Sequence, residues 1–97
     1  MKTINIKKQV KGTSTNMEGF ALKCILQPFL NKREVVKVSF ENTTPMSSSF
    51  FNSSFGELID EYGYDVFRLM VKPVNITAQH MSLIKQYIQW HNENEVV

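Results

Sequence analysis

Hydrophobic residues along this chain recur at two spacings, one typical of strands and one typical of helices. Val35–Phe40 holds three valines and a phenylalanine, a composition that favours a buried strand. After a loop over Glu41–Met46, apolar residues recur three or four positions apart, at Phe51, Phe55, Leu58, Ile59 and Tyr62. This spacing predicts an amphipathic helix over 50–62, with Ser47 or Ser48 as its N-cap and Gly63 at its end.

The carboxyl-terminal third repeats the order of strand and helix. Val66–Val71 carries apolar residues at alternate positions and predicts a third strand. Lys72–Asn75 leaves that strand, and Thr77 or Asn75 is positioned to cap a last helix. The apolar stripe expected along this helix consists of Met81, Ile84, Tyr87 and Ile88.

The amino-terminal third is expected to form a strand and then a helix. Ile4, Ile6 and Val10 are separated by polar residues, as in a strand with one face in water. A turn cluster, Gly12–Asn16, follows, and Thr15 or Asn16 is a suitable N-cap.

The helix that follows should begin near Glu18. Pro28 lacks a backbone donor, so the helix should kink or end near Gln27. Its buried face is expected to hold Met17, Phe20, Ala21, Cys24, Ile25 and Phe29, broadened by Leu22, Leu26 and Leu30.

The predicted order is β-α-β-α-β-α, which indicates an α/β fold: a small, mostly parallel sheet packed by helices. The pattern leaves open whether the first strand pairs parallel, pairs antiparallel or splits into a hairpin. Ninety-seven residues are enough for one hydrophobic core, so we expect a single domain over 1–97 with its core at about 4–91.

The charges are unevenly distributed along the chain, although the net charge is only +2. Residues 1–33 carry a net charge of +6, whereas residues 41–65 carry a net charge of −5 with no lysine or arginine. Such asymmetry can orient a partner or a second copy of the chain. Two solvated faces of opposite sign would give the same pattern.

Several classes of function find no support in the sequence. Cys24 is the one cysteine, so a disulfide within the chain and a cysteine-based zinc site are excluded, and its apolar neighbours predict a buried, inert thiol. His80 and His91 are not spaced as metal ligands, and His80 is expected at the surface. Nucleophile-elbow and nucleotide-loop motifs are absent. We therefore expect no enzyme, no cofactor and no metal.

The remaining signals concern partners and location. The lysines lack the interleaved aromatic residues of a single-strand platform, which disfavours nucleic acid. No apolar run is long enough to span a membrane and no signal peptide is visible, so a cytoplasmic location is expected. Tyr87 and Trp90 either pack the last helix against the sheet or form an exposed interaction patch.

Three consecutive serines, Ser47, Ser48 and Ser49, stand where the central helix begins. Exposed amides at a helix start favour an anion or a phosphoryl group. Phosphorylation there would add about −1.5 to −2 charges. The alternative is simple capping of the helix.

Three short motifs lie around and after these serines: Val38-Ser39-Phe40, the run from Ser49 to Gly56, and Met70-Val71-Lys72-Pro73-Val74-Asn75. They resemble the small bacterial STAS-like domain family of unknown function, and the resemblance covers roughly residues 17–90. In that family a strand ending in Leu-Asp-Phe leads to a helix that opens with a small residue and continues Phe-Ala-Asp-Glu. Here Ser39 replaces the strand aspartate, and Asn52-Ser53 stands where Asp-Glu is usual.

The parent STAS fold of anti-sigma-factor antagonists implies a phosphorylation switch. There the helix begins with Asp-Ser-Ser-Gly, and a partner kinase of the ATPase type phosphorylates the first serine. The resemblance places Ser47 on the aspartate, Ser48 on the phosphorylated serine and Ser49 on the next serine, whereas Phe50 replaces the glycine.

These observations predict a regulatory domain that binds another protein and performs no catalysis. The expected contact and phosphorylation residues are Ser47, Ser48, Ser49, Asn52 and Asn75. One alternative is a ligand- or nucleotide-binding domain, enzymatic or not, that uses a crevice at Ser47–Ser49. Another is a homodimer in which the basic amino-terminal third of one copy meets the acidic helix of its neighbour.

Overall fold

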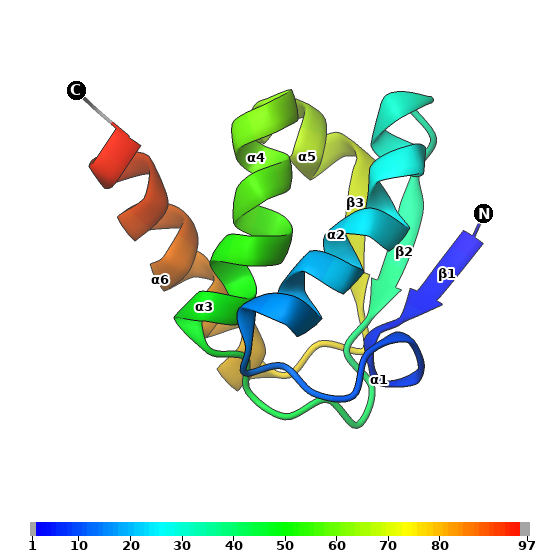
Figure 1. Ribbon diagram of the computed structural model, residues 1–97, viewed down its shortest axis with the longest axis vertical. Coiled ribbons are helices and arrows are strands. Elements are labelled where there is room, and N and C mark those ends of the chain that lie inside the picture. The colour runs from blue at the N-terminus through cyan, green and yellow to red at the C-terminus, as the bar shows by residue number, and fades with distance from the viewer. Residues whose placement is uncertain (1, 96–97) are drawn as a thin grey trace.

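A three-stranded parallel sheet forms one layer of the molecule in the computed structural model, which describes the backbone of residues 2–95 and the side chains of residues 2–90 (Figure 1). The strands lie in the order β1 (Lys2–Asn5), β2 (Val36–Ser39) and β3 (Val71–Val74). The two crossovers advance in the same direction, so right-handed connections put their helices on one face of the sheet.

The opposite face of the sheet is open to solvent. Thr3, Lys37 and Lys72 are level with one another in the register of the three strands, and all three are exposed. The sheet is therefore one layer of a two-layer α/β fold.

Helices form the other layer of the molecule (Figure 1). The helices are α1 (Ile6–Gln9), α2 (Asn16–Asn31), α3 (Ser48–Phe51), η1 (Asn52–Gly56), α4 (Glu57–Tyr62), α5 (Tyr64–Met70) and α6 (Ala78–Glu95). The three elements α3, η1 and α4 follow one another without a break and form one helix, whose middle turn is a wider π turn. Inside that turn the buried Ser54 hydroxyl donates to the Phe50 carbonyl over 2.7 Å.

Aromatic residues of the central helix form the middle of the core. The ring of Phe55 lies 6.2 Å from that of Phe40, 5.9 Å from that of Phe51 and 5.7 Å from that of Phe67. Edge-on and tilted ring contacts of this kind add about 0.5–1.5 kcal/mol each beyond the burial of area. Aliphatic residues from β1, α2 and β2 close the core around these rings: Ile4, Leu22, Leu26, Leu30, Val36 and Val38.

Most of the predicted architecture is confirmed. The α/β class, the three strands and the central helix all appear, and β1 pairs parallel with β2. Gly63 ends the central helix with φ of 89°, a conformation that favours glycine because it has no Cβ.

The third strand lies later in the chain than the sequence indicated. The segment predicted as a strand over Val66–Val71 is mostly the helix α5, and β3 begins at Val71. Phe67 is buried against the core, whereas Leu69, expected on the same strand face, is 51% exposed. A short run of β-branched and aromatic residues does not distinguish a strand from a helix turn, and here the packing of Phe67 decides.

The first strand is shorter than expected. It ends at Asn5, and Ile6–Gln9 forms a single helical turn closed by a 3.0 Å bond from the Val10 amide to the Ile6 carbonyl. Ile6 and Val10 are four residues apart, so the turn places both side chains in the core.

The helix α2 buries a different face from the one predicted. Leu22, Leu26 and Leu30 are fully buried, but Met17 is 84% exposed, Phe20 is 57% exposed and Cys24 is exposed. The expectation of a buried Cys24 thiol was therefore wrong.

Gly19 explains this orientation of α2. A Cβ built on Gly19 would lie 2.5 Å from the carbonyl oxygen of Phe50, so the two helix backbones touch on this side. Of the predicted kink or end near Gln27, the end was wrong, because α2 continues through Pro28 to Asn31. Pro28 cannot donate to the Cys24 carbonyl, but Cys24 lies on the exposed side, where water can bind that carbonyl.

Replacing Gly19 by alanine should lower the stability of the domain. In an exposed helix this change stabilises by about 0.5–1 kcal/mol. Here the added methyl group overlaps backbone, and we expect a loss of about 1–3 kcal/mol in the free energy of unfolding, measured by urea denaturation. Gly12→Ala is the matched control, since its nearest neighbour is the flexible Glu18 carboxylate. A Gly19→Ala variant as stable as the wild type would contradict the contact.

Candidate interaction groove

The central helix begins at Ser48 and its N-cap is Ser47, one of the two caps predicted. The Ser47 hydroxyl accepts a 3.1 Å bond from the Phe50 amide and donates a 2.9 Å bond to the Ser14 carbonyl. The Ser47 amide in turn donates to the Thr13 carbonyl over 2.9 Å. Ser47 therefore caps its own helix and also fastens it to the segment before α2.

Ser48 and Ser49 differ from Ser47 in having no capping role. Both are exposed on the first turn of α3, and in the part of the chain that the structure describes neither hydroxyl forms a hydrogen bond. Capping of the helix, the alternative weighed for the three serines, therefore applies to Ser47, and the hydroxyls of Ser48 and Ser49 remain accessible.

A groove between the start of the central helix and α6 brings two of the expected residues together. Its volume is about 410 Å³, and its walls are Ser48, Asn52, Gln86, Tyr87 and Trp90. Ser48 and Asn52 are one turn apart on α3 and η1, and the other three residues come from the facing side of α6, which runs beside α3 (Figure 1). Trp90 is 55% exposed, so the groove offers an aromatic surface to solvent.

Tyr87 anchors α6 to the loop before the central helix. Its hydroxyl donates to the Met46 carbonyl over 3.1 Å, and its ring lies 5.3 Å from that of Phe51. Of the two alternatives weighed for Tyr87 and Trp90, packing of the last helix applies to Tyr87, whereas Trp90 is largely exposed and its role in an interaction patch stays a prediction.

His80 is a second anchor for the same loop. It is 4% exposed, so the expectation of a surface histidine was wrong. One ring nitrogen, Nε2, lies 3.2 Å from the Thr44 carbonyl, and Nδ1 lies 2.9 Å from the Thr77 hydroxyl. Thr77 also accepts the His80 amide as the N-cap of α6, so donation from Nε2 to Thr44 leaves both ring nitrogens paired.

The other expected site residue, Asn75, does not line the groove. It has φ of 52° at the end of β3, and its side-chain amide donates to the Ser39 hydroxyl over 3.0 Å. Ser39 is buried and also accepts the Glu41 amide over 3.3 Å. Asn75 therefore joins the carboxyl ends of β2 and β3.

The acidic side of the central helix contacts α2. The Glu61 carboxylate accepts from Gln27 over 2.6 Å and lies 4.0 Å from the Lys23 ammonium. Hydrogen bonds from Tyr62 and Gln27, with the charge of Lys23, lower the pKa of Glu61. The contribution of these bonds to stability is thus present at neutral pH and is lost as the pH falls through that lowered value. Burial raises the pKa of Tyr62.

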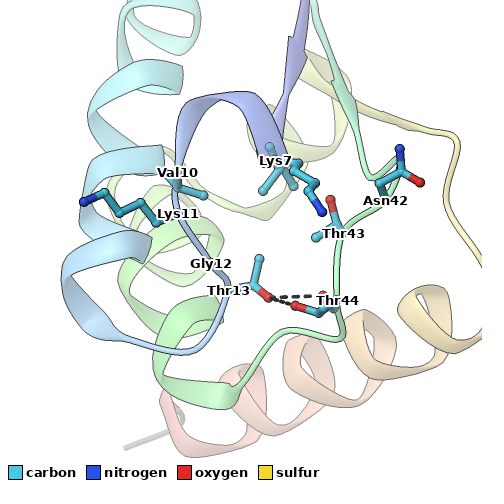
Figure 2. A pocket seen from close by; sticks show the side chains of 9 residues that line it. Lys7, Val10, Lys11, Gly12, Thr13, Asn42, Thr43 and Thr44 are labelled. Atoms are coloured by element: carbon cyan, nitrogen blue, oxygen red, sulfur yellow. Dashed lines mark hydrogen bonds between the residues drawn. The ribbon is translucent and has the colours of Figure 1, made fainter.

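A small pocket lies at the carboxyl ends of β1 and β2 (Figure 2). Its volume is about 80 Å³, and its walls are Ile6, Lys7, Val10, Lys11, Gly12, Thr13, Asn42, Thr43 and Thr44. The Lys7 ammonium points across it toward Thr43, and Thr13 bonds to the carbonyl and hydroxyl of Thr44 at 3.1 and 3.0 Å.

An open hollow adjoins this pocket on the other side of Lys7 and Asn42 and includes Asn5, Lys8 and Glu41. The Asn5 Oδ1 atom is buried and lacks a hydrogen-bond partner among the described residues.

The described residues show neither a metal-binding cluster nor a membrane-spanning helix. No group of three or more acidic, histidine or cysteine side chains is arranged to hold a metal ion. None of the described helices combines the length and apolar character needed to cross a membrane.

The fold and the helix start define a small parallel α/β domain with its exposed serines at the carboxyl edge of the sheet. Over residues 22–81 the sequence matches the family model of the STAS-like domain of unknown function (DUF4325). The chain therefore belongs to this family, as the motifs had indicated. Comparison with curated proteins gave no match, and neither did comparison with solved structures.

Sequence reasoning missed part of the groove and all of the pocket. Gln86 carried no signal, because nothing in the periodicity says which polar residue of α6 faces Ser48. Lys7 contributes to the positive charge of residues 1–33, but its position in the pocket depends on the helical turn of α1, which the strand-like spacing of Ile4, Ile6 and Val10 concealed.

The different roles of Ser47 and Ser48 can be tested by comparing the free energies of unfolding of two variants. Ser47→Ala removes the cap and the bond to Ser14, so the free energy of unfolding should fall by about 0.5–2 kcal/mol. Ser48→Ala should change it by less than about 0.5 kcal/mol. Urea denaturation of both variants measures the difference, and equal stabilities would contradict the assignment of Ser47 as the cap.

Proposed function

We propose that this chain is a regulatory domain that binds a protein partner in the cytoplasm through the groove between α3 and α6, with no catalysis of its own. The observation that supports the proposal is the meeting of Ser48 and Asn52 with Tyr87 and Trp90 along one groove. Aromatic side chains with polar neighbours are typical of the centres of protein interfaces.

The groove suits a segment that presents an apolar side chain beside a polar group. Trp90 and Tyr87 supply the apolar surface, while Asn52 and Gln86 each supply an amide that both donates and accepts. A helix or extended segment of a signalling protein has this chemistry, and an ATPase-type kinase is the partner that the resemblance to the parent STAS fold implies.

Phosphorylation of Ser48 would control this binding. The Ser48 hydroxyl is exposed at the rim, so a kinase can reach it without unfolding the domain. The added charge would lie beside Tyr87 and Trp90, where an apolar partner residue would have to displace its hydration shell. The phosphorylated domain should therefore bind the partner more weakly.

The proposal predicts that Ser48 is modified when the domain is produced together with an ATPase-type kinase encoded beside its gene. Mass spectrometry should find one phosphate on Ser48 and none in the Ser48→Ala variant, while the Ser49→Ala control remains phosphorylated. Unmodified serines throughout would exclude the switch but leave the binding surface to be tested separately.

The binding surface itself is tested with the same partner by size-exclusion chromatography and calorimetry. Trp90→Ala should weaken the complex about thirtyfold or more, as expected for a central aromatic residue. Ser48→Glu should also weaken it, whereas Lys37→Gln on the open face of the sheet should not. A complex that tolerates Trp90→Ala would place the interface elsewhere.

A second candidate function, binding of a small anion, is favoured by the pocket beside Lys7. The ammonium of Lys7 supplies donors suited to a phosphate group, whereas the hydroxyls of Thr13 and Thr43 already donate to the Thr44 and Glu41 carbonyls. Asn5 borders the adjoining hollow, and its Oδ1 atom is buried without a hydrogen-bond partner among the described residues. A phosphorylated metabolite that carries hydroxyl groups fits both features.

This second function predicts that phosphate raises the melting temperature relative to chloride at equal ionic strength. A stabilisation of about 1 kcal/mol corresponds to about 4–8 °C in a domain of this size. Lys7→Gln should abolish the shift and Lys37→Gln should retain it. Loss of the shift in Ser48→Ala instead would move the anion to the helix start, and no shift with phosphate or a phosphorylated sugar would retire the idea.

A further inference from the structure

The outer face of α2 is apolar where a surface helix is normally polar. Its exposed residues recur at helical spacing and include no charged side chain: Met17, Phe20, Ala21, Cys24, Pro28 and Asn31. This face is opposite to the one formed by Leu22, Leu26 and Leu30, which packs into the core. The helix therefore has two apolar sides. One packs into the core, and on the other the Lys23 ammonium lies 5.8 Å from the centre of the Phe20 ring.

Hollows on both sides of this stripe make room for side chains of a partner. On one side Met17 and Phe20 line a hollow of about 330 Å³ with Asn16, Ser53 and Glu57. On the other side Met17 and Ala21 line a hollow of about 220 Å³ with residues of α1 and the segment after it, among them Lys11. An exposed apolar stripe between two such hollows marks an interaction surface.

The charges that border the stripe are of opposite sign on its two sides. The side of α4 carries Glu57, which lines the hollow beside Phe20, and Glu61, which is paired with Lys23. The side of α1 carries Lys11, which lines the hollow beside Ala21, and Glu18 in the same hollow is bound to the N-cap hydroxyl of Thr15. Glu57 and Lys11 both flank Met17, so they stand at the same height along the helix.

We propose that the outer face of α2 binds a second copy of this chain, with the two α2 helices side by side and parallel. A twofold axis along the helix direction exchanges the two borders of the stripe, so the acidic border of each copy meets the basic border of the other. An antiparallel pair would instead place like borders together, and repulsion disfavours it. Self-complementarity of this kind is what a twofold interface requires.

The parallel arrangement makes each residue of the stripe face its own copy. Phe20 packs against Phe20 of the second copy, and Cys24 faces Cys24 one turn further along. Glu57 of each copy pairs with Lys11 of the other at the rim. The groove between α3 and α6 is a separate surface, so this inference does not depend on the proposed function.

The oligomeric state tests the proposal directly. Sedimentation equilibrium over a concentration series should show a dimer for the wild type, and Phe20→Asp should raise the dissociation constant about thirtyfold or more. Leu69→Asp is the matched control, because Leu69 is exposed to a similar degree on α5 and should not affect the dimer. Circular dichroism and melting temperatures confirm that each variant is folded.

Two further experiments test the parallel arrangement of the two α2 helices. Mild oxidation should link two wild-type chains through Cys24, and Cys24→Ser or Phe20→Asp should prevent the link. Lys11→Glu and Glu57→Lys should each weaken the dimer, and the two changes in one chain should restore it.

Three results would overturn the proposal. These are a monomer at all concentrations, a dimer indifferent to Phe20→Asp, and a dimer in which Cys24 cannot be linked. Binding of the monomer to anionic lipid vesicles, dependent on Phe20, would assign the face to a membrane surface instead and would also refute it.

Discussion

The contact between Gly19 and the Phe50 carbonyl sets the geometry on which the rest of the helical layer depends. Because a glycine stands there, the backbone of α2 can approach the central helix closely. Its neighbours at this point are the Phe50 carbonyl and the Ser53 side chain. The same contact fixes the rotation of α2 about its axis, with Leu22, Leu26 and Leu30 inward. Met17, Phe20 and Cys24 then have to face outward, and an apolar surface is the consequence.

The loop between β2 and the central helix is held from two independent directions. Thr13 bonds to Thr44 from the amino-terminal side, and His80 and Tyr87 bond to the Thr44 and Met46 carbonyls from α6. These bonds satisfy backbone groups in a loop whose neighbours are buried, which a polar group away from water requires. They also couple α6 to the helix start, so the groove that contains Ser48 has two walls fixed to the same loop.

The sequence predicted the elements better than it predicted their orientation. Strand β2, the cap at Ser47 and the stop at Gly63 follow from local rules, because a β-branched run, a serine and a glycine each have a short-range physical reason. The inward face of α2 does not, since apolar residues surround that helix and the choice depends on Gly19, thirty-one residues away from its contact at Phe50. His80 was misplaced for a similar reason: its partners, Thr44 and the ring of Phe40 at 5.5 Å, are distant in sequence.

A serine at the helix start has a physical advantage over an aspartate in this structure. An aspartate could accept from the Phe50 amide as Ser47 does, but it has no proton to donate to the Ser14 carbonyl. A carboxylate there would face that carbonyl oxygen and repel it. The hydroxyl both donates and accepts, so a serine at position 47 fits the close docking of this helix against the segment before α2. The next serine along the helix has no such contact, and the hydroxyl of Ser48 is exposed at the rim of the groove.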